Sequence, residues 1–326
     1  MRSGLGSLNA KTAASIEDHA KKLGDAFLPG AQATLHRLTS LFTKDGDFDY
    51  SEKKREHVYS EALDHLTRVH AVIRHGRKYL TERLEDPDLK PETDTAIAAW
   101  LGHAWQLREL RDCGLVESNV ELVQLAFRSY DDLARREYVD VGMWMNLSSG
   151  RIQLTENYRP YRAAKHIRSE DSSYSVAQVE ELFVYPGEVN PRVRWDQMKP
   201  REAKKADLKK VAKFAHGEIA KLIKEVRSSL RSPLGVKQPV YAIRFQTIGR
   251  VGGEFALEDG SGQRLALQDD GAVDEPKTCE SLAFLPAEFL KDQTAVVRFR
   301  HDLDSGELRA KPLSIVSASN VVRLAY

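Results

Sequence analysis

The spacing of apolar residues changes along this chain, from a helical spacing in its first part to a period of two in its last part. Up to about residue 138 apolar side chains recur every three or four residues, and from about Gln238 they alternate with polar ones. The clearest helical row is Val58, Ala62, Leu66, Val69, Ile73 and Leu80, which we expect to be buried. Two such patterns in separate stretches predict an α+β fold.

The first part is expected to be a helical domain. Cap and breaker residues such as Pro29-Gly30, Asp86-Pro87 and Cys113-Gly114 bound its segments. They predict a first helix that is capped by Asn9 or Ser15 and runs through Leu23, followed by helices over about 31–42, 52–84, 91–110 and 119–136.

An acidic linker precedes the third helix. Its residues Asp45, Asp47, Asp49, Ser51 and Glu56 have the spacing of a calcium-binding loop. Tyr50 stands where such a loop needs a glycine, so we favour an acidic turn that caps the helix.

The segment after Gly142 has a mixed character. Residues 143–147 and 151–154 flank the turn Ser148-Ser149-Gly150, which predicts a hairpin. A short helix over 161–168 and a strand-like stretch over 175–184 follow. A long amphipathic helix is then expected over 200–231, with the apolar stripe Leu208, Val211, Ala215, Ile219, Leu222 and Val226.

The last part reads as a series of short strands. They fall at about 240–245, 254–257, 264–267, 295–300 and 321–324, with hairpin turns at Asp259-Gly260 and Asp304-Ser305-Gly306. This pattern predicts a small antiparallel β-barrel or sandwich. The expected organisation is a helical domain (1–138), a mixed hairpin and junction segment (139–199), a long basic helix (200–234) and a β-barrel-like domain (235–326).

Composition limits the kinds of partner. The 326 residues include 49 basic and 48 acidic ones, so a polyanion site would have to come from local clustering. Only two cysteines, Cys113 and Cys279, are present and lie far apart, which argues against a disulfide framework and a thiolate zinc site. The sequence shows no secretory signal and no apolar run long enough to span a membrane, so we expect a cytoplasmic protein.

Arginines alternate with tyrosines between Asn157 and Trp195. Guanidinium groups bind phosphates and tyrosine rings stack on bases, so the segment is one candidate for a polyanion site. The other interpretation, which we favour, is a structural junction whose tyrosines are buried and whose arginines pair with Glu170, Asp171, Glu180 and Glu181.

The helix over 199–231 has eleven basic and four acidic residues, a net charge of +7. Such a helix either binds an anionic partner or is a solvated face over a buried stripe. Together the two segments give these candidate residues for a polyanion or a protein partner: Tyr158, Arg159, Tyr161, Arg162, Lys165, Arg168, Arg192, Arg194, Lys204, Lys205, Lys209, Lys210 and Lys213.

No catalytic constellation is recognisable. The sequence contains no HExxH, no GxSxG and no Walker A lysine. His65, His70 and His75 are spaced by five residues, which places them on different faces of one helix. We expect no enzymatic activity, no cofactor and no metal site.

Several short stretches resemble one bacterial family. They include Tyr130-Asp131-Asp132, Asn157-Tyr158-Arg159-Pro160-Tyr161, Tyr185-Pro186-Gly187 and Ile248-Gly249-Arg250-Val251. Residues 100 to 260 resemble the region that follows the zinc finger in SWIM-type zinc-finger proteins. The cysteines of that finger are missing from this chain, so no zinc ligand can be assigned to it.

The resemblance implies a scaffold role in a multi-protein system. Genes of this family often accompany MoxR-type AAA+ ATPases and von Willebrand A proteins. We therefore expect a non-enzymatic adaptor that binds a partner protein, with a nucleic-acid-binding module as the alternative.

Overall fold

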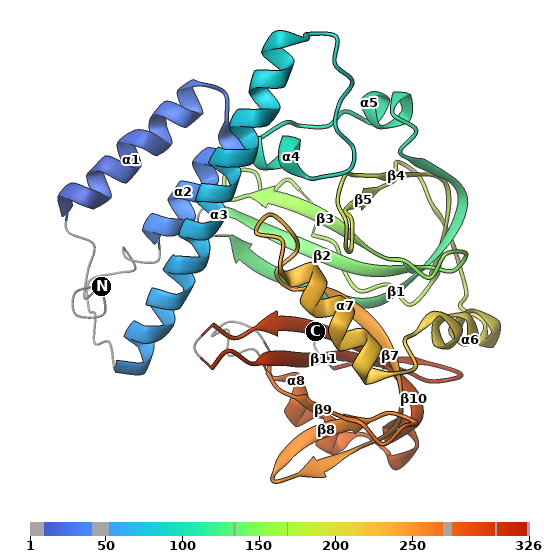
Figure 1. Cartoon of the computed structure of the whole chain (residues 1–326). Coiled ribbons are helices and arrows are strands. Elements are labelled where there is room, and N and C mark those ends of the chain that lie inside the picture. The colour runs from blue at the N-terminus through green and yellow to red at the C-terminus, as the bar shows by residue number, and fades with distance from the viewer. Residues whose placement is uncertain are drawn as a thin grey trace. The chain divides into compact units, whose positions relative to one another are not determined.

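A computed structural model describes residues 10–40, 52–132, 135–167, 169–269, 276–303 and 305–324 (Figure 1). The chain divides into two compact units. The first unit comprises Met1–Gln106, Asp132–Arg136 and Asp302–Glu307, and the second comprises the remaining residues. The first unit is built mainly from helices and the second contains two antiparallel sheets, so the predicted α+β class is confirmed.

The first unit contains four helices among its described residues. They are α1 (Ala10–Asp25), α2 (Pro29–Ser40), α3 (Glu52–Glu85) and α4 (Ile97–Leu101). The first three confirm the helix predicted to run through Leu23, which begins at Ala10, and the helices predicted over 31–42 and 52–84. The helix predicted over 91–110 is wrong in extent, because only α4 and the start of α5 (Leu107–Asp112) are helical there.

Helix α3 packs through small residues. Helices α2 and α4 lie against it, and its buried positions include Ala62, Ala71 and Val72. Leu66, Ile73 and Leu80, which the sequence pattern placed in the buried row, are instead exposed. Small residues on one side let neighbouring helices approach closely, and this leaves the larger apolar side chains on another side.

The first sheet of the second unit has β1 at its centre. Its strands are β1 (Val116–Asp132), β2 (Glu137–Asn146), β3 (Ile152–Pro160), β4 (Val176–Val184), β5 (Val193–Arg194) and β6 (Lys199–Arg201). They run in the order β3-β2-β1-β4-β5, with β6 also paired to β4. The predicted hairpin is confirmed as β2 and β3, whereas residues 161–167 form turns rather than the predicted helix.

The helix predicted over 119–136 is wrong, because most of that stretch belongs to β1. Consecutive residues such as Leu122 and Val123 are both buried, in different apolar clusters. A central strand covered on both faces has apolar residues at odd and even positions alike, and this imitates the pattern of a helix.

The second sheet confirms the strands predicted near the end of the chain. Its order is β12-β11-β10-β7-β8-β9, from β7 (Val240–Val251), β8 (Glu254–Glu258), β9 (Arg264–Leu267), β10 (Lys291–His301), β11 (Leu308–Val316) and β12 (Val321–Arg323). Strand β7 pairs with both β8 and β10, and the amide of Gln268 donates to the carbonyl of Ala310 on β11 at 2.9 Å.

The connectivity of β7 to β11 is that of an OB-fold, a partly open five-stranded barrel. A three-strand meander is followed by the short helical segments α8 (Thr278–Ser281), η1 (Leu282–Phe284) and η2 (Ala287–Leu290), and then by the β10–β11 hairpin. The sheet is not a closed barrel. This connectivity supports many different functions, so it gives none by itself.

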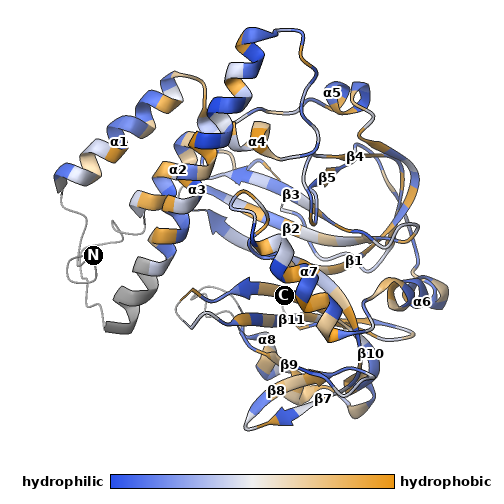
Figure 2. Ribbon diagram, in the orientation of Figure 1, coloured by the Kyte–Doolittle hydropathy of each residue, from blue (hydrophilic) through white to orange (hydrophobic). Residues whose placement is uncertain are grey.

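Two helices occupy the place of the single long helix predicted over 200–234. They are α6 (Lys205–Phe214) and α7 (Ile219–Leu230). The break lies at His216, whose amide donates to the carbonyl of Ala242 at 2.9 Å and whose carbonyl accepts from the amide of Arg244 at 2.8 Å. Residue 216 therefore pairs with β7 and cannot continue the helix. The predicted apolar stripe is nevertheless buried, and α7 shows both an apolar and a hydrophilic side in Figure 2.

The two sheets of the second unit share one apolar cluster. Val123 and Met143 of the first sheet, Val240 and Val296 of the second sheet, and Val211 of α6 all belong to it. A further cluster joins α7 to the second sheet, and another covers the other side of β1 and β4. Residues from both sheets and from α6 are thus buried together.

Candidate interaction surfaces

Arg159 of β3 is held by Asp140 of β2. Its Nε and Nη2 atoms each donate to a different carboxylate oxygen of Asp140, both at 2.9 Å. The Asp140 side chain is 1% exposed and also accepts from the hydroxyl of Ser129 and the amide of Glu170. Burial raises the pKa of Asp140, but hydrogen bonds from Arg159, Ser129 and the Glu170 amide outweigh it and lower the pKa below its ordinary value. Arg159 therefore has a structural role in the second unit.

The neighbouring aromatic residues are also engaged inside the second unit. The hydroxyl of Tyr158 donates to Glu156, and that of Tyr161 donates to Asp131. Burial, with the nearby carboxylate of Glu156, raises the pKa of Tyr158. The guanidinium of Arg192 lies 5.1 Å from the centre of the Tyr158 ring. Tyr158 is thus half-buried with its ring near Arg192, and the hydroxyl of Tyr161 is engaged within the unit.

The predicted pairing partners of the arginines were wrong in detail. Glu180 pairs with Lys199 at 3.1 Å and Glu181 with Arg111 at 2.8 Å. The acid that holds Arg159 is Asp140, which lies on the adjacent strand and carries no sequence signal of this role.

Three basic candidates of this segment remain on the surface. Arg162, Lys165 and Arg194 are exposed, and Arg194 approaches Asp196 at 4.0 Å. Arg168, the last basic residue predicted here, lies outside the described residues. The linker with the calcium-loop spacing (45–51) also lies outside them.

The same segment contains a junction between the two sheets. Asn190 donates through its side-chain amide to the carbonyls of Ile152 at 3.2 Å and Val240 at 3.0 Å. Its side-chain oxygen accepts from the amide of Val240 at 2.7 Å. One buried amide thus connects β3 to the first residue of β7, which supports the structural interpretation of the Asn157–Trp195 segment.

Helix α6 presents a strip of lysines. Lys204, just before the helix, and Lys205, Lys209, Lys210 and Lys213 within it are all exposed. Residues four apart lie on one line of a helix, separated by about 6 Å along its axis. Across the described part of the chain, no acid forms an ion pair with any of these five lysines. The strip is therefore available to an anionic partner.

The start of α6 is fixed by charged groups. Asp207 accepts from the backbone amide of Lys204 at 2.8 Å and from Arg201 at 2.7 Å, while Arg201 also pairs with Glu121 of β1 at 2.8 Å. Hydrogen bonds from Arg201 lower the pKa of both carboxylates. These contacts attach α6 to the first sheet and leave its lysines outside.

The lysine strip and the exposed residues Arg162 and Lys165 do not form one patch. A Cβ atom on Gly150, in the β2–β3 turn, would lie 2.5 Å from the ring of Phe214, so β3 begins beside the end of α6. Strand β3 has nine residues, which span about 30 Å in extended backbone. Arg162 and Lys165 come directly after the C-terminal end of β3, the end opposite Gly150. The structure therefore separates two groups that the sequence analysis combined.

Helix α3 bears an exposed apolar row, three residues of which, Leu66, Ile73 and Leu80, were expected from the sequence to be buried. Apolar residues recur along the helix (Figure 2). Leu63, Leu66, Ile73, Leu80 and Leu84 are between 39% and 83% exposed. The spacings between them are three, seven, seven and four residues, which keeps them on one side of the helix. This spacing is the signal by which the surface could have been found in the sequence. Exposed apolar side chains that gather on one face mark interaction sites.

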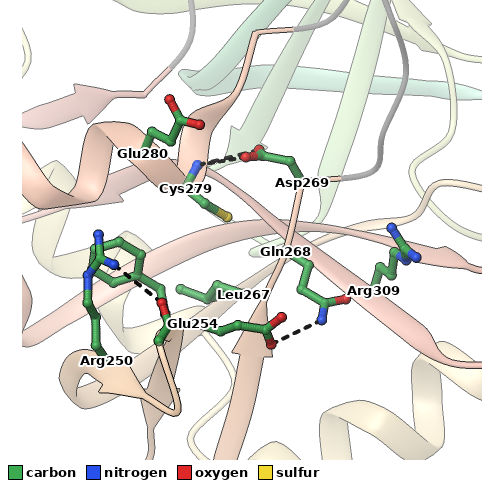
Figure 3. A pocket seen from close by; sticks show the side chains of 10 residues that line it. Arg250, Glu254, Leu267, Gln268, Asp269, Cys279, Glu280 and Arg309 are labelled. Atoms are coloured by element: carbon green, nitrogen blue, oxygen red, sulfur yellow. Dashed lines mark hydrogen bonds between the residues drawn. The ribbon is translucent and has the colours of Figure 1, made fainter.

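A pocket of about 440 Å³ lies in the second sheet (Figure 3). Its acids bond to their neighbours: Glu254 accepts from Gln268 at 3.3 Å, and Asp269 accepts from the amide of Thr278 at 2.8 Å. Basic and acidic side chains are mixed in it, so its charge favours neither an anion nor a cation. It is lined by Arg250, Gly253, Glu254, Phe255, Leu267, Gln268, Asp269, Cys279, Glu280 and Arg309.

The described residues contain neither a metal-binding cluster nor a helix that could span a membrane. No group of three or more histidine, cysteine or acidic side chains in those residues could hold a metal ion. No helix within the same residues is long and apolar enough to cross a membrane.

Comparison with known proteins gives little guidance. No protein-family model matches the chain, and no curated protein matches it. Among solved structures, a murine DNA binding protein bound with double-stranded DNA matches 64% of this chain and 98% of its own, with 9% identity and a TM-score of 0.25. At that TM-score the likeness supports no conclusion about fold or function.

Proposed function

We propose that this protein is a non-enzymatic adaptor that binds a partner protein through the exposed apolar row of α3. The observation behind the proposal is that Leu63, Leu66, Ile73, Leu80 and Leu84 are exposed on one long helix of the first unit. An apolar side chain left in water costs free energy that a protein partner recovers by covering it. The internal pairing of Arg159, Tyr158 and Tyr161 supports this choice over a polyanion site in the Asn157–Trp195 segment.

The test compares the wild-type protein with Leu66→Lys/Ile73→Lys in pull-downs. The resemblance to SWIM-type proteins makes a MoxR-type AAA+ ATPase or a von Willebrand A protein the first partner to purify and mix with it. The wild type should retain the partner and the variant should lose it. Glu82→Lys, an exposed position away from the row, is the control and should bind normally. Equal binding by the wild type and the double variant would refute the proposal.

Nucleic-acid binding through α6 is the second candidate. The observation that favours it is the strip of exposed lysines at 204, 205, 209, 210 and 213. Contacts to phosphates release counterions, so binding should weaken steeply as salt rises. Lys205→Glu/Lys209→Glu/Lys213→Glu should abolish binding to a labelled duplex or single strand, whereas Arg162→Glu should have little effect. Absence of binding at low salt would exclude this candidate.

A further inference from the structure

The exposed row of α3 is part of a heptad repeat. If Leu63 is position a, the exposed residues at 63, 70, 77 and 84 are all a positions, and those at 66, 73 and 80 are all d positions. All seven side chains are exposed in the first unit, and every d position is Leu or Ile. An a/d seam of this kind is the surface that one helix offers to another in a coiled coil.

The charges around this seam are of one sign. In the part of α3 with described side chains, the seam and its edges hold His70 and Arg77 at a, Arg74 at e and Arg83 at g. The acids of the same stretch, Glu61, Asp64, Glu82 and Glu85, all fall at b or f positions, away from the seam. Arg74 and Arg77 form no ion pair with a described residue. The seam is therefore apolar at every d position and at the outer a positions Leu63 and Leu84, and it is basic at its central a positions and along its edges.

This charge pattern argues against a second copy of the chain as the occupant. Two α3 helices side by side in parallel register would place Arg77 opposite Arg77. The antiparallel register that pairs Ile73 with Arg77 would place Arg74 near Arg74. The register that pairs Ile73 with His70 would instead place Arg77 against Leu66, which buries a charge without an acidic partner. Like charges that face each other in this way destabilise the pair. Opposite charges at the edges of such a seam set the choice of partner.

We propose that the α3 seam binds an amphipathic helix whose apolar a and d residues are flanked by Asp and Glu. This inference rests on the proposed adaptor function and specifies the element of the partner that α3 recognises. The apolar residues of α3 are covered by those of the partner helix. The long side chains of Arg74 and Arg77 extend along the interface and pair with the flanking acids.

The probe is a synthetic peptide of about four heptads with Ile at a, Leu at d and Glu at e and g. A second peptide has Lys in place of each Glu. The full-length protein should bind the acidic peptide, with an increase in helical circular dichroism, and should bind the basic peptide at least tenfold more weakly. Ile73→Lys should abolish binding of the acidic peptide.

Charge reversal supplies the specific control. Arg74→Glu/Arg77→Glu should weaken the acidic peptide by more than tenfold and strengthen the basic one. Lys78→Glu makes the same change at an exposed b position of the same helix and should change neither. Thermal melts of each variant will show whether the fold is kept.

The outcomes separate this inference from the adaptor proposal. If the acidic peptide does not bind, or both peptides bind alike, the acidic-helix inference is wrong. A wild-type dimer that Ile73→Lys dissociates would identify a second copy as the occupant and would also overturn it. If the peptide binds as expected but Leu66→Lys/Ile73→Lys still retains the natural partner, the adaptor proposal fails by itself.

Discussion

Arg159 and Asp140 form a two-pronged ion pair between adjacent strands, with Nε and Nη2 each 2.9 Å from a carboxylate oxygen. The carboxylate is almost completely buried, whereas the guanidinium retains 15% of its exposure. This geometry places the most conspicuous arginine of the sequence inside the fold. Its neighbour Arg162 lies on the surface. The two residues therefore differ in what their removal would do.

Arg159→Ala should lower the free energy of unfolding by about 2–4 kcal/mol, because it leaves the buried carboxylate of Asp140 without its cationic partner. Arg162→Ala is the matched control and should cost less than about 0.5 kcal/mol, as is usual for an exposed side chain. Urea unfolding of the full-length proteins measures both values. Equal costs for the two variants would show that the ion pair does not stabilise the fold.

Acid should weaken the attachment of α6 through Arg201. Hydrogen bonds from Arg201 lower the pKa of Glu121 and Asp207 in the folded protein. Their stabilising effect is therefore complete above the ordinary carboxyl pKa values near about 4 and is lost as the pH falls through the lowered values. Arg201→Gln should be clearly less stable than wild type at neutral pH, and the difference should shrink as the pH falls below about 4.

The measurement is urea unfolding of wild type and Arg201→Gln at several pH values. Lys199→Gln is a suitable control, because Lys199 pairs with Glu180 on the surface and both side chains are largely exposed. Its effect should be small at every pH. A difference between wild type and Arg201→Gln that stays constant down to acid pH would contradict the linkage.

Asn190 has two separable roles. Its φ of 47° is in the left-handed region, which asparagine tolerates better than most residues, and its side-chain amide bonds to Ile152 and Val240. Asn190→Gly keeps the backbone conformation but loses the three hydrogen bonds, so it should cost about 1–3 kcal/mol. Asn190→Ala adds backbone strain of about 1 kcal/mol. If both variants unfold at the wild-type urea concentration, Asn190 does not hold the sheets together.

The sequence predicted the type of most local elements better than it predicted which elements lie next to one another in the fold. The β2–β3 hairpin could be found from its turn residues Ser148-Ser149-Gly150, although β2 is buried on both faces. Strand β9 could be found because its residues alternate between exposed and buried positions. Strand β11 was missed because it contains Pro312, which cannot donate to a ladder. The structure accommodates that proline where the register with β10 shifts between Val296 and Val297.

The same difference between residues close in sequence and residues brought together by the fold applies to the candidate surfaces. The lysines of α6 could be placed on one exposed strip because they are close in sequence. The partner of Arg159 could not be found, since Asp140 lies nineteen residues away and becomes adjacent only through strand pairing. The α3 row was misassigned because periodicity identifies a common face but not which face is buried. Burial there depends on Ala62, Ala71 and Val72, whose small size decides how closely neighbouring helices approach.

Gly150, the glycine of the β2–β3 turn, should tolerate no side chain. Its φ is 75°, and a Cβ atom there would lie 2.5–2.7 Å from three atoms of Phe214. Gly150→Ala should therefore combine left-handed strain of about 1 kcal/mol with an overpacking cost of about 1–3 kcal/mol. Gly114 has nearly the same φ, 73°, with nothing within 4 Å of its Cβ position, so Gly114→Ala measures the strain alone.

The difference between the two alanine variants in urea unfolding reports the contact between the hairpin turn and α6. Adding Phe214→Leu to Gly150→Ala should recover part of the lost stability, because a smaller, flexible side chain can yield to the new methyl group. Phe214→Leu added to Gly114→Ala should lower the stability only by the cost of Phe214→Leu itself. Equal losses for Gly150→Ala and Gly114→Ala would mean that the turn does not lie against Phe214, and the inference that the two basic groups are separate would lose its basis.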